Sequence, residues 1–169
     1  MVENGIGASL KRKEDNRFLT GKGNYTDDIN RPGQTYAYIV RSPHAHATIN
    51  SVDISAAKSA PGVVAVFVGQ DLLDDAVGGL VCGASVTGKG GEVNKVPPRN
   101  VLTMDKARFV GDPIAVVIAE TLAQAKDGAE LVAIDYTELP STVSTANSDA
   151  DGAPQLHEEC PNNVALDWE

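Results

Sequence analysis

The chain has 169 residues and a formal net charge of −9, which fits one domain or a domain with long tails. Its hydrophobic content of 42% is enough for a core, and because aromatic residues make up only 5%, that core must consist mostly of Val, Ile, Leu and Ala. The acidic balance argues against a nucleic-acid-binding surface, since binding phosphates requires clustered Lys and Arg.

No apolar run reaches the roughly 18 residues of a membrane span, and the N-terminal sequence MVENGIGASLKRKED has no apolar signal-peptide core. The two cysteines are Cys82 and Cys160. Nothing in the sequence places them together, so we favour two free thiols in a reducing compartment over a disulfide. We therefore expect a cytoplasmic protein.

Residues 1–33 carry no sustained periodicity and predict an extended N-terminal arm. The segment combines glycines and alternating charges with a few apolar anchors: Leu10, Phe18, Leu19, Tyr25 and Ile29. One short strand is predicted near Asn24–Thr26. Asp27 and Asp28 are a candidate metal or acid pair, but adjacent carboxylates point different ways in an extended chain, so we favour a turn or cap role.

Three strands are predicted in the next stretch. Tyr36–Arg41 alternates as a half-buried strand does. In Ala47–Ile54 the apolar phase changes between Ile49 and Val52, which predicts a bulge or bend. Val63–Val68 is apolar on both faces. Short helical turns are predicted at Ser55–Ala60, ended by Pro61-Gly62, and at Gln70–Leu73.

Two histidines, His44 and His46, follow the first strand, and the spacing puts them on one side of an extended chain. Some zinc sites use this spacing, but no third ligand lies nearby in the sequence, and the remaining histidine is His157. We therefore favour a structural or interface role over a metal site.

The stretch Gly83–Gly90 comes within one residue of the phosphate-binding pattern G-x-x-x-x-G-K-[ST]. The missing Ser or Thr would hold magnesium. The pattern must also run into a helix whose N-terminus faces the phosphates, and Gly90-Gly91 and Pro97-Pro98 oppose such a helix. We favour a solvent-exposed loop.

The strongest signal in the sequence is a strand, helix and strand between Arg108 and Pro140. Pro113–Ala119 is apolar on both alternating faces, which is typical of a strand covered on both sides. Thr121 with Gln124 predicts a capping box. The helix that follows has one narrow apolar face, and a strand from Val132 to Tyr136 comes after it. That face is formed by Leu122, Ala125, Ala129 and Val132.

After Pro140 the chain turns polar, from Ser141 to Gly152, and ends in a segment that contains His157-Glu158-Glu159-Cys160. A metal pair is conceivable in this tetrapeptide, but a four-ligand site needs partners that the sequence does not offer.

Several of these blocks, in this order, resemble the opening of molybdenum hydroxylase large subunits, the family of aerobic carbon monoxide dehydrogenase, aldehyde oxidase and xanthine dehydrogenase. The resemblance covers essentially the whole chain, and the bacterial subunits of the carbon monoxide dehydrogenase type look most similar. The matching residues are Gly7-x-Ser9, Arg12-x-Glu14-Asp15-x-Arg17-Phe18-Leu19-Thr20-Gly21-x-Gly23-x-Tyr25-x-Asp27-Asp28, Val40-Arg41-Ser42-Pro43-His44-Ala45-His46-Ala47, Pro61-Gly62-Val63, Arg108-Phe109-Val110-Gly111-Asp112-Pro113, Asp135-Tyr136, Leu139-Pro140 and Asn162-Asn163-Val164-Ala165.

The resemblance implies an α+β fold of the α/β hammerhead type, with a mixed sheet, a helix packed across it and a long N-terminal arm. It implies three parts: the arm at 1–33, the hammerhead core at 34–140, and a polar segment at 141–169 that leads to a cofactor domain. We expect this chain to end where that domain would begin. No residue matches a catalytic residue, cofactor ligand or metal ligand of the family, so we assign no site residue of any of these kinds.

The same resemblance implies a role as the N-terminal structural and assembly domain of a molybdopterin-dependent oxidoreductase. Such enzymes hydroxylate aldehydes or N-heterocycles, or oxidise carbon monoxide. The complete enzyme would hold molybdopterin cytosine dinucleotide, with iron–sulfur clusters and FAD on partner subunits or domains. Two alternatives stay open: an autonomous small-molecule or protein-binding module of the same fold, and a nucleotide-binding protein that uses Gly83–Gly90.

Overall fold

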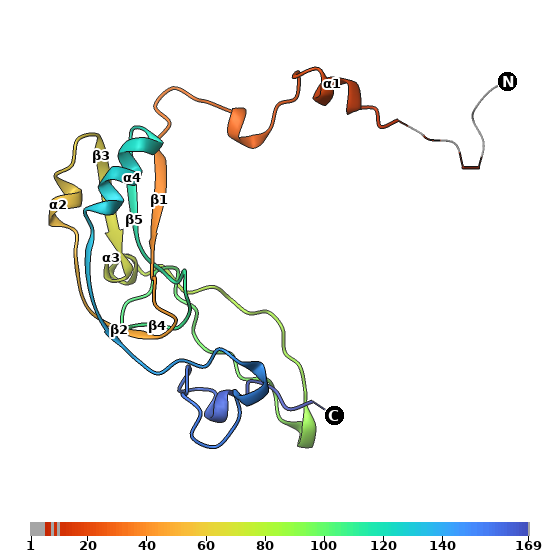
Figure 1. The fold of residues 1–169 in the computed structure, drawn as a ribbon, viewed down its shortest axis with the longest axis vertical. Coiled ribbons are helices and arrows are strands. Elements are labelled where there is room, and N and C mark those ends of the chain that lie inside the picture. Colours follow the sequence, from red (N-terminus) through yellow and green to blue (C-terminus); the bar gives the residue numbers. More distant parts are fainter. Residues whose placement is uncertain (1–5, 8, 10, 169) are drawn as a thin grey trace. The chain divides into compact units, whose positions relative to one another are not determined.

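A three-stranded antiparallel sheet with a helix across it holds the core of residues 35–169 (Figure 1). The strands are β1 (Tyr36–Arg41), β5 (Pro113–Ala119) and β3 (Val63–Val68), in the order β1-β5-β3. The helix is α4 (Leu122–Glu130), which packs on β1 and β5. The strands predicted at residues 36–41, 63–68 and 113–119 are confirmed.

The computed structural model describes residues 6, 7, 9 and 11–168, in two units, Met1–Gln34 and Thr35–Glu169. In the first unit α1 (Asp15–Leu19) is one short helix, and Phe18 stacks on Tyr25 with ring centroids 5.3 Å apart. The strand predicted near Asn24–Thr26 is wrong. A 3₁₀ helix, η1 (Thr26–Asp28), forms there, and Asp28 Oδ2 accepts the Tyr25 N–H at 2.9 Å, which confirms a cap role for Asp28 of the acidic pair. The predicted anchor Leu10 lies outside the described residues.

A second antiparallel sheet has the order β4-β2-β6. Its strands are β4 (Lys106–Ala107), β2 (Ala47–Asp53) and β6 (Ala133–Glu138). The predicted irregularity in the second strand is confirmed, because the register between β2 and β6 shifts between Ile49 and Ser51. Asn50, which the shift leaves without an opposite residue, donates side-chain hydrogen bonds to Asp135 Oδ2 at 3.0 Å and Thr137 Oγ1 at 2.9 Å.

The helix α4 begins as its capping residues predict. The Gln124 N–H donates to Thr121 Oγ1 at 3.2 Å, and the Thr121 hydroxyl donates to Gln124 Oε1 at 2.8 Å. Its buried face consists of small residues: Ala125, Gly128 and Ala129. A Cβ atom on Gly128 would lie 2.8 Å from Val63 Cγ2, so glycine lets the helix approach the sheet closely. The predicted apolar face is wrong at Leu122, the first residue of α4, which is exposed.

The α+β class is confirmed, but the strands form two antiparallel sheets where one mixed sheet was predicted. The physical reason is that both edges of β5 are occupied, by β1 and β3, so the chain that leaves α4 cannot pair beside β5. It pairs with β2 as β6. Apolar periodicity carries no information about which strands are neighbours.

The core lies between the first sheet and its helices. Ala57 of α2 (Ser55–Lys58), Val66, Val117 and Ala129 form one buried cluster. A further helix, α3 (Gly69–Asp74), follows β3, and both short helical turns predicted here are confirmed. Three 3₁₀ helices complete the described chain: η2 (Lys89–Gly91), η3 (Thr145–Asn147) and η4 (Pro161–Asn163). Among the described residues, no helix is both long and apolar enough to cross a membrane.

Replacing Val117 by Asp should unfold the core. Val117 is fully buried in the middle of β5, so Val117→Asp places a carboxylate without a partner among apolar side chains. We expect a loss of several kcal/mol, comparable to the total stability of roughly 5–15 kcal/mol of a small domain. Urea unfolding measures it, with Val64→Asp as the control because Val64 in β3 is exposed. Equal stability of the two variants would contradict the central position of β5.

Candidate functional site

The loop Arg108–Pro113 joins separate parts of the second unit. Gly111 has φ +95°, a backbone conformation that favours glycine, and this turn brings the loop against the end of β1. The Gly111 N–H donates to the Ser42 carbonyl at 2.8 Å, and the Ser42 N–H donates to the Asp112 carbonyl at 2.9 Å. The Arg41 guanidinium donates to the Gly111 carbonyl at 2.8 Å. The loop is therefore a fixed junction.

The buried carboxylate of Asp112 is the centre of this junction. Its Oδ1 accepts a hydrogen bond from the Thr103 hydroxyl at 2.7 Å, and its Oδ2 accepts one from the Arg108 N–H at 3.0 Å. The Thr103 N–H donates to the carbonyl of Pro113, the first residue of β5, at 2.7 Å. Asp112 and Pro113 therefore both bind Thr103. Asp112 thus uses one oxygen to hold the Thr103 side chain and the other to hold the Arg108 backbone, so its role is structural.

Arg108 extends the junction to the C-terminal segment. Its Nε donates to the Leu156 carbonyl at 3.0 Å, and its Nη1 donates to the Lys106 carbonyl at 3.1 Å. The ion pair with Asp105 is long, at 3.8 Å, and Asp105 is largely exposed, so it contributes little to stability. The guanidinium therefore connects β4 to a segment about 50 residues further along the sequence.

A cavity of about 660 Å³ opens beside this loop. His157 lies on its wall, where burial, followed by the charge of Arg108, lowers the pKa of the imidazole from its ordinary value of 6.5. Apolar and basic side chains form most of the remaining wall, which includes Leu80, Pro97, Arg99, Val101 and Phe109.

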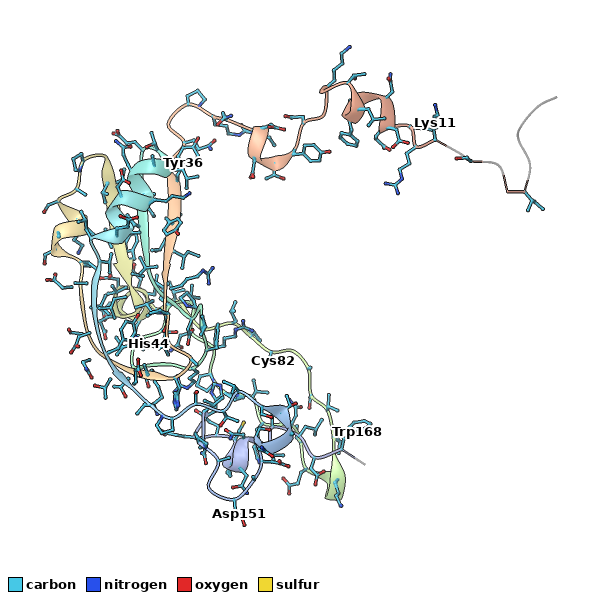
Figure 2. The ribbon with its side chains drawn as sticks, in the orientation of Figure 1. Lys11, Tyr36, His44, Cys82, Asp151 and Trp168 are labelled. Atoms are coloured by element: carbon cyan, nitrogen blue, oxygen red, sulfur yellow. The ribbon has the colours of Figure 1, made fainter. Side chains whose placement is uncertain are left out.

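The two histidines predicted on one side of a strand lie in the loop between β1 and β2. The Ser42 side chain holds this turn, because its Oγ accepts the His44 N–H at 3.0 Å and donates to the His44 carbonyl at 3.1 Å. His46 is buried, and its Nδ1 donates to the Pro140 carbonyl at 2.7 Å. His44 is labelled in Figure 2. Its Nδ1 lies 3.2 Å from Glu138 Oε1.

Two polar atoms near these histidines are buried without a hydrogen-bond partner among the described residues, His46 Nε2 and the Tyr136 hydroxyl. The Tyr136 ring contacts the His44 ring at a centroid distance of 4.7 Å. Burial raises the pKa of the Tyr136 phenol, and the nearby Ser42 hydroxyl opposes this by a smaller amount. In the described part of the chain, no three His, Cys, Asp or Glu side chains come together as metal ligands.

The glycine-rich stretch Gly83–Gly90 does not lead into an α-helix. It runs to an isolated bridge between Thr87 and Val93 and to η2. Most of its residues are exposed, as predicted, but the structure adds a contact that the sequence did not indicate: the Lys89 N–H donates to the Asp167 carbonyl at 2.8 Å. A Cβ on Gly88 would lie 2.2 Å from that carbonyl oxygen, so glycine is required for this contact.

The polar C-terminal segment is also held by one asparagine. Asn163 has φ +57°, and its side chain accepts the Leu156 N–H at 2.9 Å and donates to the Ser148 carbonyl at 2.8 Å. Asparagine tolerates this conformation better than other non-glycine residues, so the pair Asn162-Asn163 was a signal for a tight turn here. Cys82 is exposed and Cys160 buried, and both are free thiols, which confirms that they do not pair.

The family model that matches the chain is described as aldehyde oxidase and xanthine dehydrogenase, α/β hammerhead domain, and it covers residues 20–140. This chain belongs to that family. The hammerhead fold predicted from the sequence is thereby confirmed, and the junction loop lies within the matched region.

Relatives of this hammerhead domain are large subunits of oxidoreductases. The chain is 38% identical over 166 residues to the nicotine 6-hydroxylase large subunit of Paenarthrobacter nicotinovorans, covering 98% of this chain and 20% of that protein. It is 39% identical over 165 residues to the carbon monoxide dehydrogenase large chain of Afipia carboxidovorans, covering 95% of this chain and 18% of that one.

Solved structures give the same result. A Cu,Mo-CO dehydrogenase matches with a TM-score of 0.74 and 37% identity, over 95% of this chain and 19% of that chain. Quinoline 2-oxidoreductase from Pseudomonas putida 86 matches with a TM-score of 0.72 and 33% identity, over 88% of this chain and 18% of that chain. The hammerhead chain thus spans about a fifth of the length of these relatives.

Removing the Asp112 carboxylate should loosen the junction of the hammerhead domain. In Asp112→Ala the Thr103 hydroxyl and the Arg108 N–H lose their acceptor. We expect a loss of about 1–3 kcal/mol for each buried donor left without a partner. Asp105→Ala is the matched control, since that carboxylate is exposed and should change stability by less than about 0.5 kcal/mol. Equal urea midpoints for the two variants would show that the Asp112 bonds are not structural.

His157 should make the stability of the domain depend on pH. Because its pKa is lowered in the folded chain, the unfolded chain binds a proton first as the pH falls below 6.5, and the folded state loses stability in that range. Between about pH 7.5 and pH 5.5, wild type should therefore lose more unfolding free energy than His157→Gln. All other titratable side chains are the same in both proteins. Parallel pH profiles would contradict the lowered pKa.

Proposed function

We propose that this chain is a structural and assembly domain of a molybdenum-dependent oxidoreductase large subunit. In this proposal it packs on the cofactor-binding part of the large subunit and helps to form the approach for the substrate. The observation that carries the proposal is the length of the chain compared with its relatives. Almost the whole chain matches, but it matches only about a fifth of each large subunit.

The side chains of the domain support a role without catalysis of its own. The buried carboxylate of Asp112 is engaged through both oxygens, and His46 Nδ1 is engaged by the Pro140 carbonyl. Among the described residues, no three His, Cys, Asp or Glu side chains come together as metal ligands, so we propose none of them as a ligand. We therefore place the metal and the catalytic groups in another part of the enzyme and assign no reaction step to this domain.

For the complete enzyme we propose molybdopterin cytosine dinucleotide as the cofactor, with iron–sulfur clusters and FAD on partner subunits or domains. The relatives include a carbon monoxide dehydrogenase, a nicotine 6-hydroxylase and a quinoline 2-oxidoreductase. The substrate class we propose is accordingly broad: carbon monoxide, an aldehyde or an N-heterocycle. We also propose a cytoplasmic location, supported by the two unpaired cysteines.

The alternative is an autonomous module that binds a small molecule or a protein with the same fold. The cavity of about 660 Å³ beside the loop Arg108–Pro113 favours it, because its volume is in the range of small-molecule sites. The nucleotide-binding alternative has less support, since Gly83–Gly90 runs into the three-residue 3₁₀ helix η2 and not into an α-helix that could receive phosphates.

The test supplies, as a second polypeptide, the part of a relative that this chain does not match. The part of the Afipia carboxidovorans carbon monoxide dehydrogenase large chain that this chain does not match is purified alone and mixed with our chain. We expect binding with a Kd of about 1 μM or below, a free energy of roughly −8 kcal/mol. The positive control is the matching fifth of the Afipia chain, purified in the same way.

Hydrogen exchange on the same samples shows which part of the chain becomes ordered on binding. The region Arg12–Gly23 buries no side chain, so its amides should exchange rapidly in the free chain and slowly in the complex. Ile114–Ala119 should be protected in both. If the Afipia control binds and our chain does not, the assembly role is wrong and the autonomous module gains.

A further inference from the structure

The sheet β1-β5-β3 has two faces, and the helices cover one of them. α4 contacts β1, β5 and β3, and α2 contacts β3 and α4. On this side Val117 of β5 and Val66 of β3 are buried in the core cluster with Ala129 of α4. Gly128 of the same helix approaches Val117 and Val63, which fixes the side of the sheet on which α4 lies.

Successive residues of a strand point to opposite faces, so the register identifies the other side. Ala37 and Ile39 of β1 lie opposite Ile118 and Val116 of β5. These β5 residues alternate with Val117 and therefore point away from α4. Ala65 and Phe67 of β3 lie opposite the same two residues from the other edge. We call these six residues the open face: Ala37, Ile39, Ala65, Phe67, Val116 and Ile118.

The open face is accessible in the described chain. Ile39 is 38% exposed, Ala37 is exposed, and the other four residues are half-buried, whereas Val117 on the helix side of β5 is fully buried. Ile114 lies on the same face as Val116 and is fully buried. Other residues therefore cover this face at Ile114, and that cover ends before Val116. Among the helices of the second unit, those with substantial packing on these strands lie on the opposite side or at the end of β3.

All six side chains of the open face are apolar. An antiparallel sheet that faces water on one side normally alternates apolar and polar residues, and a strand that is apolar on both faces is normally covered on both. The sequence predicts such a cover for Pro113–Ala119, and from Val116 onward the helices among the described residues provide it only on the side of α4. A contiguous apolar surface of this kind marks an interaction site.

We propose that the open face is the docking surface for the part of the large subunit that this chain does not match. The inference rests on the proposed function and specifies its surface. The occupant is inferred from length: relatives of this domain carry about four fifths of their chain outside the matched region, so a large neighbouring part of the same subunit is available to cover this face. None of the six positions is charged, so the surface suits an apolar segment and not a charged ligand.

The experiment introduces a charge on this face and on a matched surface elsewhere. Ile39→Glu and Ala37→Glu alter the open face at two exposed positions, and Leu131→Glu is the control because Leu131 is 45% exposed and follows α4. Each variant is mixed with the unmatched part of the Afipia chain used above. Circular dichroism melting first checks that all three variants fold as wild type does, which their exposure favours.

We expect at least a tenfold loss of affinity for Ile39→Glu and Ala37→Glu, and an affinity within twofold of wild type for Leu131→Glu. If wild type binds and both open-face variants bind equally well, the docking surface is wrong and the assembly role stands. If wild type fails to bind while the Afipia control binds, both proposals are wrong. Sedimentation of the chain alone identifies another occupant: a dimer that Ile39→Glu converts to monomer would assign the face to a second copy and overturn the proposal.

Discussion

The burial of β5 is the constraint on which the rest of the second unit depends. Val117 and Ala115 have no exposed surface, and this requires strands on both edges of β5 and small residues in α4. Gly128 meets the second requirement, because any larger residue would push the helix away from Val63 and Val117. The residues that protect β5 thus come from four separate stretches of the chain, and none of them forms this core alone.

The loop before β5 fixes where that strand begins. Asp112 can be buried because the Thr103 hydroxyl and the Arg108 N–H replace water as donors to its two oxygens, which offsets part of the cost of placing a carboxylate there. The same loop binds the end of β1 through Ser42 and the C-terminal segment through Arg108. The motif Arg108–Pro113 therefore connects elements by hydrogen bonds, which explains its polar residues without any chemistry.

Local features of this chain could be predicted from sequence because their causes are local. Thr121 caps α4 through a residue three positions away, and the phase change after Ile49 reports a bulge within one strand. The neighbour of a strand is not a local property: β6 follows α4 directly, yet it pairs with β2, more than 80 residues earlier. The contacts of Arg108 with Leu156 and of Lys89 with Asp167 also join distant segments, so no spacing or periodicity indicated them.

The histidines of the candidate site show that residue type alone does not predict a metal site. The three histidines suggested a metal site, but the structure places them in different surroundings. His44 lies beside Glu138, and His46 is hydrogen-bonded to the Pro140 carbonyl. His157 forms part of the wall of the cavity beside Arg108. The carboxylate of Asp112 and the guanidinium of Arg108 are used within the fold, while the described residues leave the apolar open face without a helix over it. An apolar surface of this kind is suited to hold a neighbour in place, since apolar contact depends on shape and area and supplies no reacting group.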